Sequence, residues 1–426
     1  MNTDLWLDAS FKGYPADAAP IPLSRVGERG WRVPGEHLSY PLAVLQRSAL
    51  EHNLQWMQAY ARRKGVWLAP HGKTPLSPEL CQMQLAAGAW GLTFANVHQA
   101  RVGVAAGAQR LILANQVLAH ADLNGLDALL SAHPGLRLWF LVDSLAQLAL
   151  IEAWQRDSGR PRVFDVLLEM GMAGQRTGCR SLPEALALAR ALAASPATRL
   201  GGVECYEGGL AQCDPVHDPV AVTAFVQQVQ AVVQACDAED LWGDQTCLLS
   251  AGGSAVFDLV LPLLQTQGLR RPVQGVLRSG CYLSHDHGRY RRFLQLVQQR
   301  EGLDSSLRPA LQVWALVQSV PEPGLALLTA GRRDVGQDMG MPVPVQHARV
   351  GSRPPAAAPG HWRVDALNDQ HAYLRFDAAA PADQCPAVGD RVALGISHPC
   401  TTFDKWRWLA LVEDDGRISG GVHTCF

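Results

Sequence analysis

The stretch Leu68–Leu76, LAPHGKTPL, follows a short apolar run and holds Lys73, one of only four lysines in the chain. The run that starts at Val66, VWLA, has the composition of a buried strand, and Pro70 ends it. Lys73 therefore lies where a strand passes into a loop. This position allows two interpretations. One is an ordinary lysine of a surface loop; the other is a partly buried amine that loses its proton and forms a Schiff base with a carbonyl cofactor.

Short apolar runs like this one recur along the chain after this stretch. Eight apolar runs alternate with helical stretches rich in alanine, leucine and glutamine. The runs are VWLA from Val66, GLTF from Gly91, LILAN from Leu111, LWFLVD from Leu138, VFDVLLEM from Val163, LGGVECY from Leu200, TCLLSAG from Thr246 and VQGVLRSG from Val273. Near-continuous apolar strands separated by helices predict a parallel sheet covered by helices. Eight βα units suit a closed (β/α)₈ barrel, with an open doubly wound sheet as the alternative.

After Arg289 the pattern changes to short β-type runs separated by proline and glycine turns, such as LQVWALVQS and RVALGIS. This pattern of short strands and turns predicts a separate, mainly β domain of about 120 residues. We expect three parts: an N-terminal segment, 1–35, packed on the β domain, the barrel over 36–300, and the β domain over 301–426.

Composition excludes several classes of protein. The formal charge is -2, and no basic tract is present, which argues against a nucleic-acid partner. The acidic N-terminal stretch, broken by Gly13 and Pro15, lacks the apolar core of a signal peptide, and no window is apolar enough for a membrane helix. Ten cysteines without a CxxC pair predict reduced thiols in a cytoplasmic protein.

Two glycine-bearing loops follow the seventh and eighth predicted strands, where (β/α)₈ barrels often hold phosphate. They are SAGGSAVFD from Ser250 and RSGCY from Arg278. Gly252 and Gly253 let backbone approach an anion, and Ser254 offers a hydroxyl. In the second loop, Gly280 makes room for the N–H groups of Cys281 and Tyr282. Ordinary tight turns are the alternative. With Lys73 across the barrel mouth, these loops suit a cofactor that carries an aldehyde and a phosphate, namely pyridoxal phosphate.

These motifs together resemble a known family. PHGKT around Lys73, RTG around Arg176, CY at Tyr206, SAGGS and RSGCY are similar to the D-serine dehydratase and D-threonine aldolase family of fold-type III pyridoxal-phosphate enzymes, over residues 35–410. The resemblance implies an alanine-racemase-like barrel plus a β domain in a homodimer. It also implies that Lys73 carries the cofactor and that Arg176 faces the pyridine nitrogen. The cofactor-binding residues expected from the motifs and the resemblance are His71, Lys73, Arg176, Tyr206, Ser250, Gly252, Gly253, Ser254, Gly280, Cys281 and Tyr282.

A second constellation, SHPCTTFDKWRW, starts at Ser397 in the predicted β domain. If this stretch is extended, His398 and Cys400 project to the same side. An imidazole and a thiolate suit Zn²⁺, although a buried cysteine beside a loop histidine is the plainer interpretation. The resemblance implies a zinc pair at these positions. Cysteine at the second position favours the dehydratase branch, since the aldolases are expected to carry an aspartate there.

The expected activity is a pyridoxal-phosphate- and zinc-dependent dehydratase of D-serine or a related β-hydroxy D-amino acid, which yields a 2-oxo acid and ammonia. A metal-dependent aldolase, a racemase and a non-catalytic cofactor-binding protein are the alternatives. Two departures from the family pattern leave the substrate open. Tyr206 is followed by Glu207, Gly208 and Gly209, where the family has Tyr-x-Gly-His, and EMGMAGQRTG carries extra residues.

Overall fold

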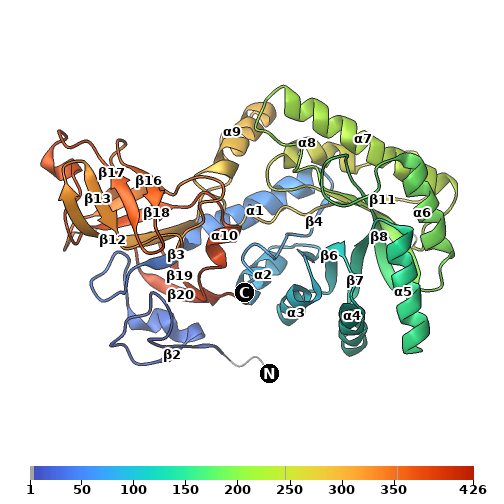
Figure 1. The fold of residues 1–426 in the computed structure, drawn as a ribbon, viewed down its shortest axis with the longest axis horizontal. Coiled ribbons are helices and arrows are strands. Elements are labelled where there is room, and N and C mark those ends of the chain that lie inside the picture. The colour runs from blue at the N-terminus through green and yellow to red at the C-terminus, as the bar shows by residue number, and fades with distance from the viewer. Residues whose placement is uncertain (1–3, 245, 353) are drawn as a thin grey trace.

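The structure, a computed structural model, describes residues 4–244, 246–352 and 354–426. Figure 1 shows a helix-covered barrel beside a body of strands, with helices α1 (Arg47–Arg63) and α9 (Arg289–Glu301) between the two. No helix among these residues is long and apolar enough to cross a membrane.

Eight parallel strands form the barrel, in the order β4, β11, β10, β9, β8, β7, β6, β5. The two ends of this sheet meet through a parallel bridge between His71 and Thr93, where the Gly72 N–H donates to the Thr93 carbonyl over 2.7 Å. The predicted (β/α)₈ barrel is therefore confirmed, and the open doubly wound alternative is wrong. The barrel strands are β4 (Trp67–Leu68), β5 (Leu92–Phe94), β6 (Arg110–Gln116), β7 (Arg137–Val142), β8 (Phe164–Met170), β9 (Thr198–Cys205), β10 (Cys247–Ala251) and β11 (Val273–Leu277).

Helices cover the outside of the barrel, and side-chain caps fix the N-terminal ends of several of them. Ser77, Asn96, Ser144 and Ser181 each accept a hydrogen bond from a backbone N–H of the following first turn. Residues 70–76, which include Lys73, are thereby confined between β4 and the capped start of the next helix. The remaining helices are α2 (Pro78–Ala86), α3 (Val97–Ala105), α4 (His120–Ala132), α5 (Leu145–Ser158), α6 (Leu182–Ala194), α7 (His217–Ala238), α8 (Phe257–Val260) and α10 (Cys400–Phe403), with 3₁₀ turns η1 (Leu23–Arg29), η2 (Leu261–Leu264) and η3 (Ala382–Gln384).

The β domain is built on an antiparallel sheet in the order β15, β14, β18, β12, β13, β17, β16. The long strand β12 also pairs with β3, which in turn pairs with β19, and β19 pairs with β20. The strands are β3 (Leu42–Gln46), β12 (Leu311–Glu322), β13 (Leu325–Leu328), β14 (Val343–Ala348), β15 (Ala356–Ala357), β16 (Arg363–Leu367), β17 (Ala372–Arg375), β18 (Arg391–Gly395), β19 (Trp408–Val412) and β20 (Ile418–His423).

Strand β3 differs from the sequence-based division of the chain, which assigns residues 36–300 to the barrel. Its residues LAVLQ stand directly before helix α1, as a barrel strand would, yet they form ladders with β12 and β19 of the β domain. The first four residues of β3 are buried, as expected for a strand between two neighbours.

The N-terminal segment lies against the β domain. It contains β1 (Trp6–Leu7) and β2 (Ile21–Pro22), and its side chains Leu7, Tyr14 and Val26 join one buried cluster with Trp314 and Trp408. The indole Nε1 of Trp408 donates to the Lys12 carbonyl over 2.9 Å. Apolar burial and this hydrogen bond fix the segment on β12 and β19.

Candidate active site at the barrel mouth

A cavity of about 370 Å³ lies at the carboxyl ends of the barrel strands, and loops of the β domain close one side of it. Of the residues singled out from the sequence, His71, Lys73, Arg176, Tyr206, Gly252, Gly253, Ser254, Gly280, Cys281, His398 and Cys400 line it. Ser250 and Tyr282 do not. The hydroxyl of Ser250 donates to the Val276 carbonyl over 3.2 Å, and the hydroxyl of Tyr282 accepts from Gln84 Nε2 over 3.3 Å.

Lys73 projects into this cavity from the loop after β4. Its amine makes no hydrogen bond or ion pair with any residue that the structure describes. Burial lowers the pKa of Lys73, and Arg176 lowers it further, against the opposing effect of the Cys400 thiol. The amine is thus shifted toward the neutral form, which is the form that attacks an aldehyde.

Buried polar atoms without partners surround the same cavity. Among the described residues, His71 Nδ1, Glu204 Oε2 and Arg278 Nε are buried and unpaired, and all three residues line the cavity. Buried polar groups are normally hydrogen-bonded, so three orphaned atoms around one space indicate a polar ligand. Burial lowers the pKa of His71 well below its usual value, which keeps the ring neutral.

Arg278 is a buried cation that the sequence analysis quoted only as the start of RSGCY. Its guanidinium forms a buried ion pair with the Glu204 carboxylate and donates to the Cys205 carbonyl over 2.8 Å. Burial raises the pKa of Glu204 to about 8, although Arg278 beside it acts in the opposite direction. Neither Glu204 nor the role of Arg278 could be found from local sequence, because their pairing joins β9 to the loop after β11.

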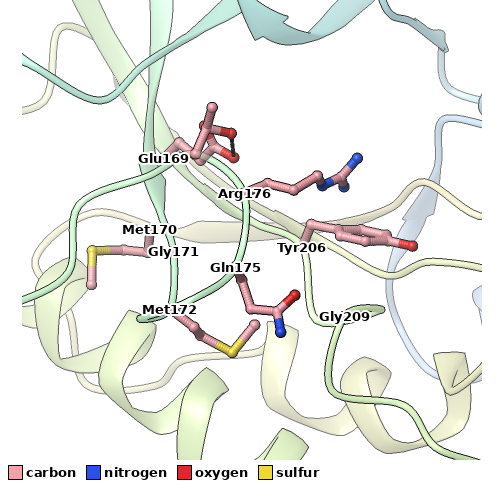
Figure 2. Close-up of a pocket in the computed structure, with 9 residues that line it drawn as sticks. Glu169, Met170, Gly171, Met172, Gln175, Arg176, Tyr206 and Gly209 are labelled. Atoms are coloured by element: carbon pink, nitrogen blue, oxygen red, sulfur yellow. Dashed lines mark hydrogen bonds between the residues drawn. The ribbon is translucent and has the colours of Figure 1, made fainter.

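Arg176 lies in a more open position than Arg278. Its Cζ atom is 4.2 Å from the centre of the Tyr206 ring, and both side chains are exposed. Figure 2 shows the two side chains directed to the same side of the loop after β8. Arg176 makes no ion pair with any described residue, so its charge is available to an anionic group at the mouth.

The loop after β8 contains the extra residues noted in EMGMAGQRTG. Cys179 returns the chain to β8, since its N–H donates to the Glu169 carbonyl over 2.8 Å. The hydroxyl of Thr177 also donates to Glu169 Oε1 over 2.8 Å, the hydrogen bond drawn in Figure 2. Burial raises the pKa of Glu169. These contacts fix the loop and hold Arg176 over Tyr206.

The first glycine loop binds a carboxylate of the chain itself. The N–H groups of Gly252 and Gly253 donate to the two carboxylate oxygens of the fully buried Glu207, over 3.0 and 2.7 Å. Gly252 has a φ of +98°, which favours glycine. The donors that remain for an external phosphate therefore lie further along, at Ser254 and in the second glycine loop.

The second glycine loop packs closely on the lysine-bearing loop. A Cβ atom on Gly280 would lie 2.6 Å from the His71 carbonyl oxygen, so only glycine fits without a shift. The Cys281 N–H donates to Ser254 Oγ over 3.1 Å, which joins the two glycine loops. The backbone N–H groups of Ser254 and Gly280 have no acceptor among the described residues. They are donors of the type that a phosphate needs.

His398 and Cys400 reach the cavity from the β domain, but not as an extended strand. Pro399 has helical backbone angles and Cys400 begins the short helix α10, so the extended conformation considered from sequence is wrong. Both residues nevertheless line the same cavity. Asp338 Oδ2 lies 2.6 Å from His398 Nδ1, and the other oxygen of Asp338 accepts from the Thr401 hydroxyl over 2.6 Å. Asp338 thus orients the imidazole and leaves Nε2 for a ligand.

The electrostatics of this pair favour a thiolate. The Cys281 thiol beside Cys400 lowers the pKa of Cys400 well below its usual value, and His398 acts in the same direction. Burial would lower the pKa of His398, but Cys400 and Asp338 outweigh it and raise the value to about 9. A thiolate with an oriented imidazole suits a zinc-like ion. Within the described ranges, no group of three His, Cys, Asp or Glu side chains is placed to hold a metal.

Comparison with known proteins agrees with this architecture. The family model described as "Alanine racemase, N-terminal domain" matches residues 45–272, more than half of the chain. The chain belongs to the alanine racemase N-terminal domain family. A second model, described as "Putative serine dehydratase domain", matches residues 310–412, the part that bears His398 and Cys400.

Two proteins resemble the chain over nearly its whole length. A D-threonine aldolase from Arthrobacter sp. is 28% identical over 386 residues, 89% of this chain and 92% of that protein. A D-threo-3-hydroxyaspartate dehydratase from Delftia sp. is also 28% identical, over 391 residues, 89% of this chain and 96% of that protein.

Solved structures show the same fold. A D-threonine aldolase from Filomicrobium marinum has a TM-score of 0.75 at 24% identity and covers 93% of this chain and 97% of its own. A cysteine-to-alanine variant of D-threo-3-hydroxyaspartate dehydratase, described as metal-free, has a TM-score of 0.70 at 25% identity, covering 91% and 97%. A histidine-to-alanine variant of that dehydratase, altered two positions before the cysteine, has a TM-score of 0.70 at 24% identity, covering 93% and 97%.

Proposed function

We propose that this protein is a pyridoxal-phosphate- and zinc-dependent dehydratase of β-hydroxy D-amino acids, which yields a 2-oxo acid and ammonia. One observation carries this proposal: the unpartnered Lys73 amine and the His398–Cys400 pair line the same cavity. An amine shifted toward its neutral form suits a carbonyl cofactor, and an imidazole–thiolate pair suits an ion that binds a hydroxyl.

The residues present fit the cofactor. Lys73 would hold it covalently, and the free N–H groups of Ser254 and Gly280 would bind its phosphate. For the pyridine nitrogen we prefer Arg278 to Arg176, because Arg278 is buried with an unpaired Nε whereas Arg176 is exposed. A guanidinium does not give up its proton, so the ring nitrogen facing it would stay unprotonated. When bound, the cofactor would supply an electron sink for the carbanion formed at the α-carbon.

The chain's own groups account for the other requirements of the reaction. Arg176, which has no ion pair among the described residues, is placed to bind the α-carboxylate of a substrate at the mouth. Burial lowers the pKa of Lys73, which favours the neutral amine that can accept the α-proton. His398 and Cys400 would hold zinc, with Asp338 fixing the imidazole. An ion held there supplies Lewis-acid chemistry for the departure of the β-hydroxyl.

An aldolase is the second candidate, and a specific observation supports it. The aldolase from Arthrobacter sp. and the dehydratase from Delftia sp. are equally identical to this chain, at 28%. In this site, either reaction would begin from a bound β-hydroxy D-amino acid. The two reactions differ in whether the Cβ–O bond or the Cα–Cβ bond breaks. We favour the dehydratase because position 400 is a cysteine.

Product analysis tests the function directly. The purified chain, loaded with pyridoxal phosphate and Zn²⁺, is incubated with D-serine, D-threonine or D-threo-3-hydroxyaspartate. A 2-oxo acid plus ammonia supports the dehydratase, and glycine plus an aldehyde supports the aldolase. An inverted amino acid would indicate a racemase, and no product from any of the three would contradict the proposal.

Metal removal tests the role of the His398–Cys400 pair. Treatment with a chelator should lower the rate at least about 100-fold, since Lewis-acid stabilisation contributes several kcal/mol, and added Zn²⁺ should restore it. A full rate in the chelated protein would show that the assigned metal role is wrong.

We further propose, from the family resemblance, that the protein is a cytoplasmic homodimer. Sedimentation equilibrium should then give twice the chain mass of 46.1 kDa. A monomer mass at the concentrations used for assay would contradict the dimer.

A further inference from the structure

Two cysteines meet where the barrel and the β domain face each other. Cys281 follows β11 and Cys400 begins α10, and their Sγ atoms are 3.7 Å apart. Both residues line the cavity. All ten cysteines are free thiols, and among the described residues no second pair of cysteine sulfurs lies within hydrogen-bonding distance. The proximity of this pair is not explained by the proposed reaction, which needs only one of the two sulfurs.

We propose that Cys281 and Cys400 form an oxidation site, in which a peroxide-class oxidant converts the two thiols to a disulfide and withdraws Cys400 from the metal. Disulfide formation follows from the positions of the two sulfurs alone. Its effect on the metal rests on the proposed function, in which Cys400 is a ligand.

The two sulfur atoms need only a small movement to form a disulfide. A disulfide has an S–S distance of about 2.05 Å, so the two sulfurs must approach by less than about 2 Å. Thr74 Oγ1 lies 3.4 Å from the Cys400 sulfur and 3.7 Å from the Cys281 sulfur, which places both sulfurs beside the same hydroxyl. Each cysteine belongs to a turn or a four-residue helix rather than to a long element, so side-chain rotation and a small loop shift can bring the sulfurs together.

Exposure sets the order of the chemical steps. Cys400 is partly exposed to the cavity, whereas Cys281 is only 5% exposed. The sulfur of Cys400 would attack hydrogen peroxide, the O–O bond would break, and one water would leave as Cys400 becomes a sulfenic acid. The sulfur of Cys281 would then attack Cys400 Sγ, breaking the S–O bond and releasing a second water. Two thiols lose two electrons and two protons in total, and the peroxide is reduced to two waters.

The disulfide would also protect the metal ligand. A sulfenic acid without a neighbouring thiol is oxidised further to a sulfinic acid, which ordinary thiols do not reduce. With Cys281 at hand, oxidation stops at a disulfide that a thiol reductant reverses. The site would therefore lose its metal under oxidising conditions and regain it afterwards.

The test uses the full chain loaded with pyridoxal phosphate and Zn²⁺ and treated with hydrogen peroxide. We expect the number of free thiols to fall by two, peptide mapping to show a Cys281–Cys400 linkage, and zinc to pass to a chromogenic chelator. Dithiothreitol should restore both thiols and zinc binding. In Cys281→Ser, peroxide should instead convert Cys400 to its sulfinic acid, and dithiothreitol should not restore zinc binding. Cys385→Ser is the matched control and should behave as the wild type, since among the described residues Cys385 bonds only to carbonyls of the β domain.

Two results would overturn the inference. One is Cys400 sulfinic acid in the wild type without a Cys281–Cys400 linkage. The other is zinc loss in Cys281→Ser that dithiothreitol reverses as fully as in the wild type. If the linkage forms while zinc stays bound, the oxidation site is supported, and the assignment of Cys400 as a metal ligand in the proposed function is wrong.

Discussion

The two ends of the barrel are made from the same eight strands, yet they are built in opposite ways. At the amino ends, Trp67, Trp90 and Trp139 stack in sequence, with ring centres 5.1 and 5.6 Å apart. Arg137 and Asp165 form an ion pair of 2.8 Å beside this stack. Aromatic stacking and the ion pair between Arg137 and Asp165 stabilise this end of the barrel.

The carboxyl ends show the reverse arrangement. Lys73 has no partner among the described residues, and the buried atoms His71 Nδ1 and Arg278 Nε are unpaired. Unpaired buried groups cost free energy of folding, so these atoms reduce the stability of the folded chain when no ligand pairs with them. The loops after the strands carry the reactive groups. Packing and ion pairs at the starts of the strands offset the free energy that these unpaired groups cost.

Replacing the amine should produce the largest effect. Lys73→Ala should lower the rate at least about 1,000-fold, about 4 kcal/mol in activation free energy, because the amine proposed to hold the cofactor and to accept the α-proton is lost. Its free energy of unfolding should not fall, since Lys73 has no partner to lose. Initial rates and urea unfolding measure the two quantities. Lys64→Ala, which removes the ion pair with Glu301 outside the cavity, is the matched control and should keep the rate.

A change at the opposite end of the barrel should affect stability instead. Trp139 is 4% exposed, so Trp139→Ala should lower the free energy of unfolding by about 3–5 kcal/mol. The value of kcat/KM per folded molecule should stay within about twofold of the wild type, because the mouth is built from other residues. Urea unfolding and steady-state kinetics at low temperature check both parts. A large loss of kcat/KM with little loss of stability would remove the distinction between the two ends.

Asp338→Asn tests whether a carboxylate of the β domain orients the His398 ring at the barrel mouth. Asp338→Asn should weaken zinc binding about 10- to 100-fold, because the carboxylate that holds the His398 ring is lost. Competition with a chelator of known affinity measures the change. Asp404→Asn alters an exposed carboxylate in the same region, whose one ion-pair partner in the described part of the chain is Lys405, and it should leave zinc affinity unchanged. Equal effects of the two substitutions would contradict the orienting role.

The smallest effect is expected at the junction of β20 with helix α2. Cys425 and Glu79 raise the pKa of His423 to about 10. The folded protein therefore binds this proton more tightly than the unfolded chain, whose pKa is about 6.5. The stabilisation is fully present below about pH 6.5 and is lost as the pH rises through about 10.

His423→Gln should lower the free energy of unfolding by about 0.5–1 kcal/mol at pH 6, a modest amount because His423 and Glu79 are 25% and 32% exposed. The difference from the wild type should vanish above about pH 10. Urea unfolding at several pH values measures it. A constant difference across this range would show that His423 acts by packing alone.

The barrel strands could be predicted because their signal is local: apolar runs of fixed length between helical stretches. Lys73 could also be placed, since a strand end determines where the following loop begins. Glu207 and Arg278 show the limit of this approach. Glu207 binds the N–H groups of Gly252 and Gly253, and Arg278 pairs with Glu204, and both contacts join neighbouring strands through space.

The proposed metal pair was harder to predict than the amine. The spacing of His398 and Cys400 suggested a site only together with the family resemblance, and the extended conformation was wrong because Pro399 begins a helical turn. Asp338 comes from a loop sixty residues away in sequence, and nothing in its neighbourhood marks it as a partner of His398. Strand β3 was missed because a short apolar run before a helix has the same local pattern in either domain.

The pairing of strand β3 also determines where the chain could be cut to separate the β domain from the barrel. The chain starts in the β domain, crosses to the barrel through α1 and returns through α9, so the β domain is completed by residues from both ends of the sequence. A truncation after residue 300 would remove β12 and β19 and leave both edges of β3 open, a template for aggregation. Swapping β domains between relatives therefore requires exchanging the first 46 residues together with the last third of the chain.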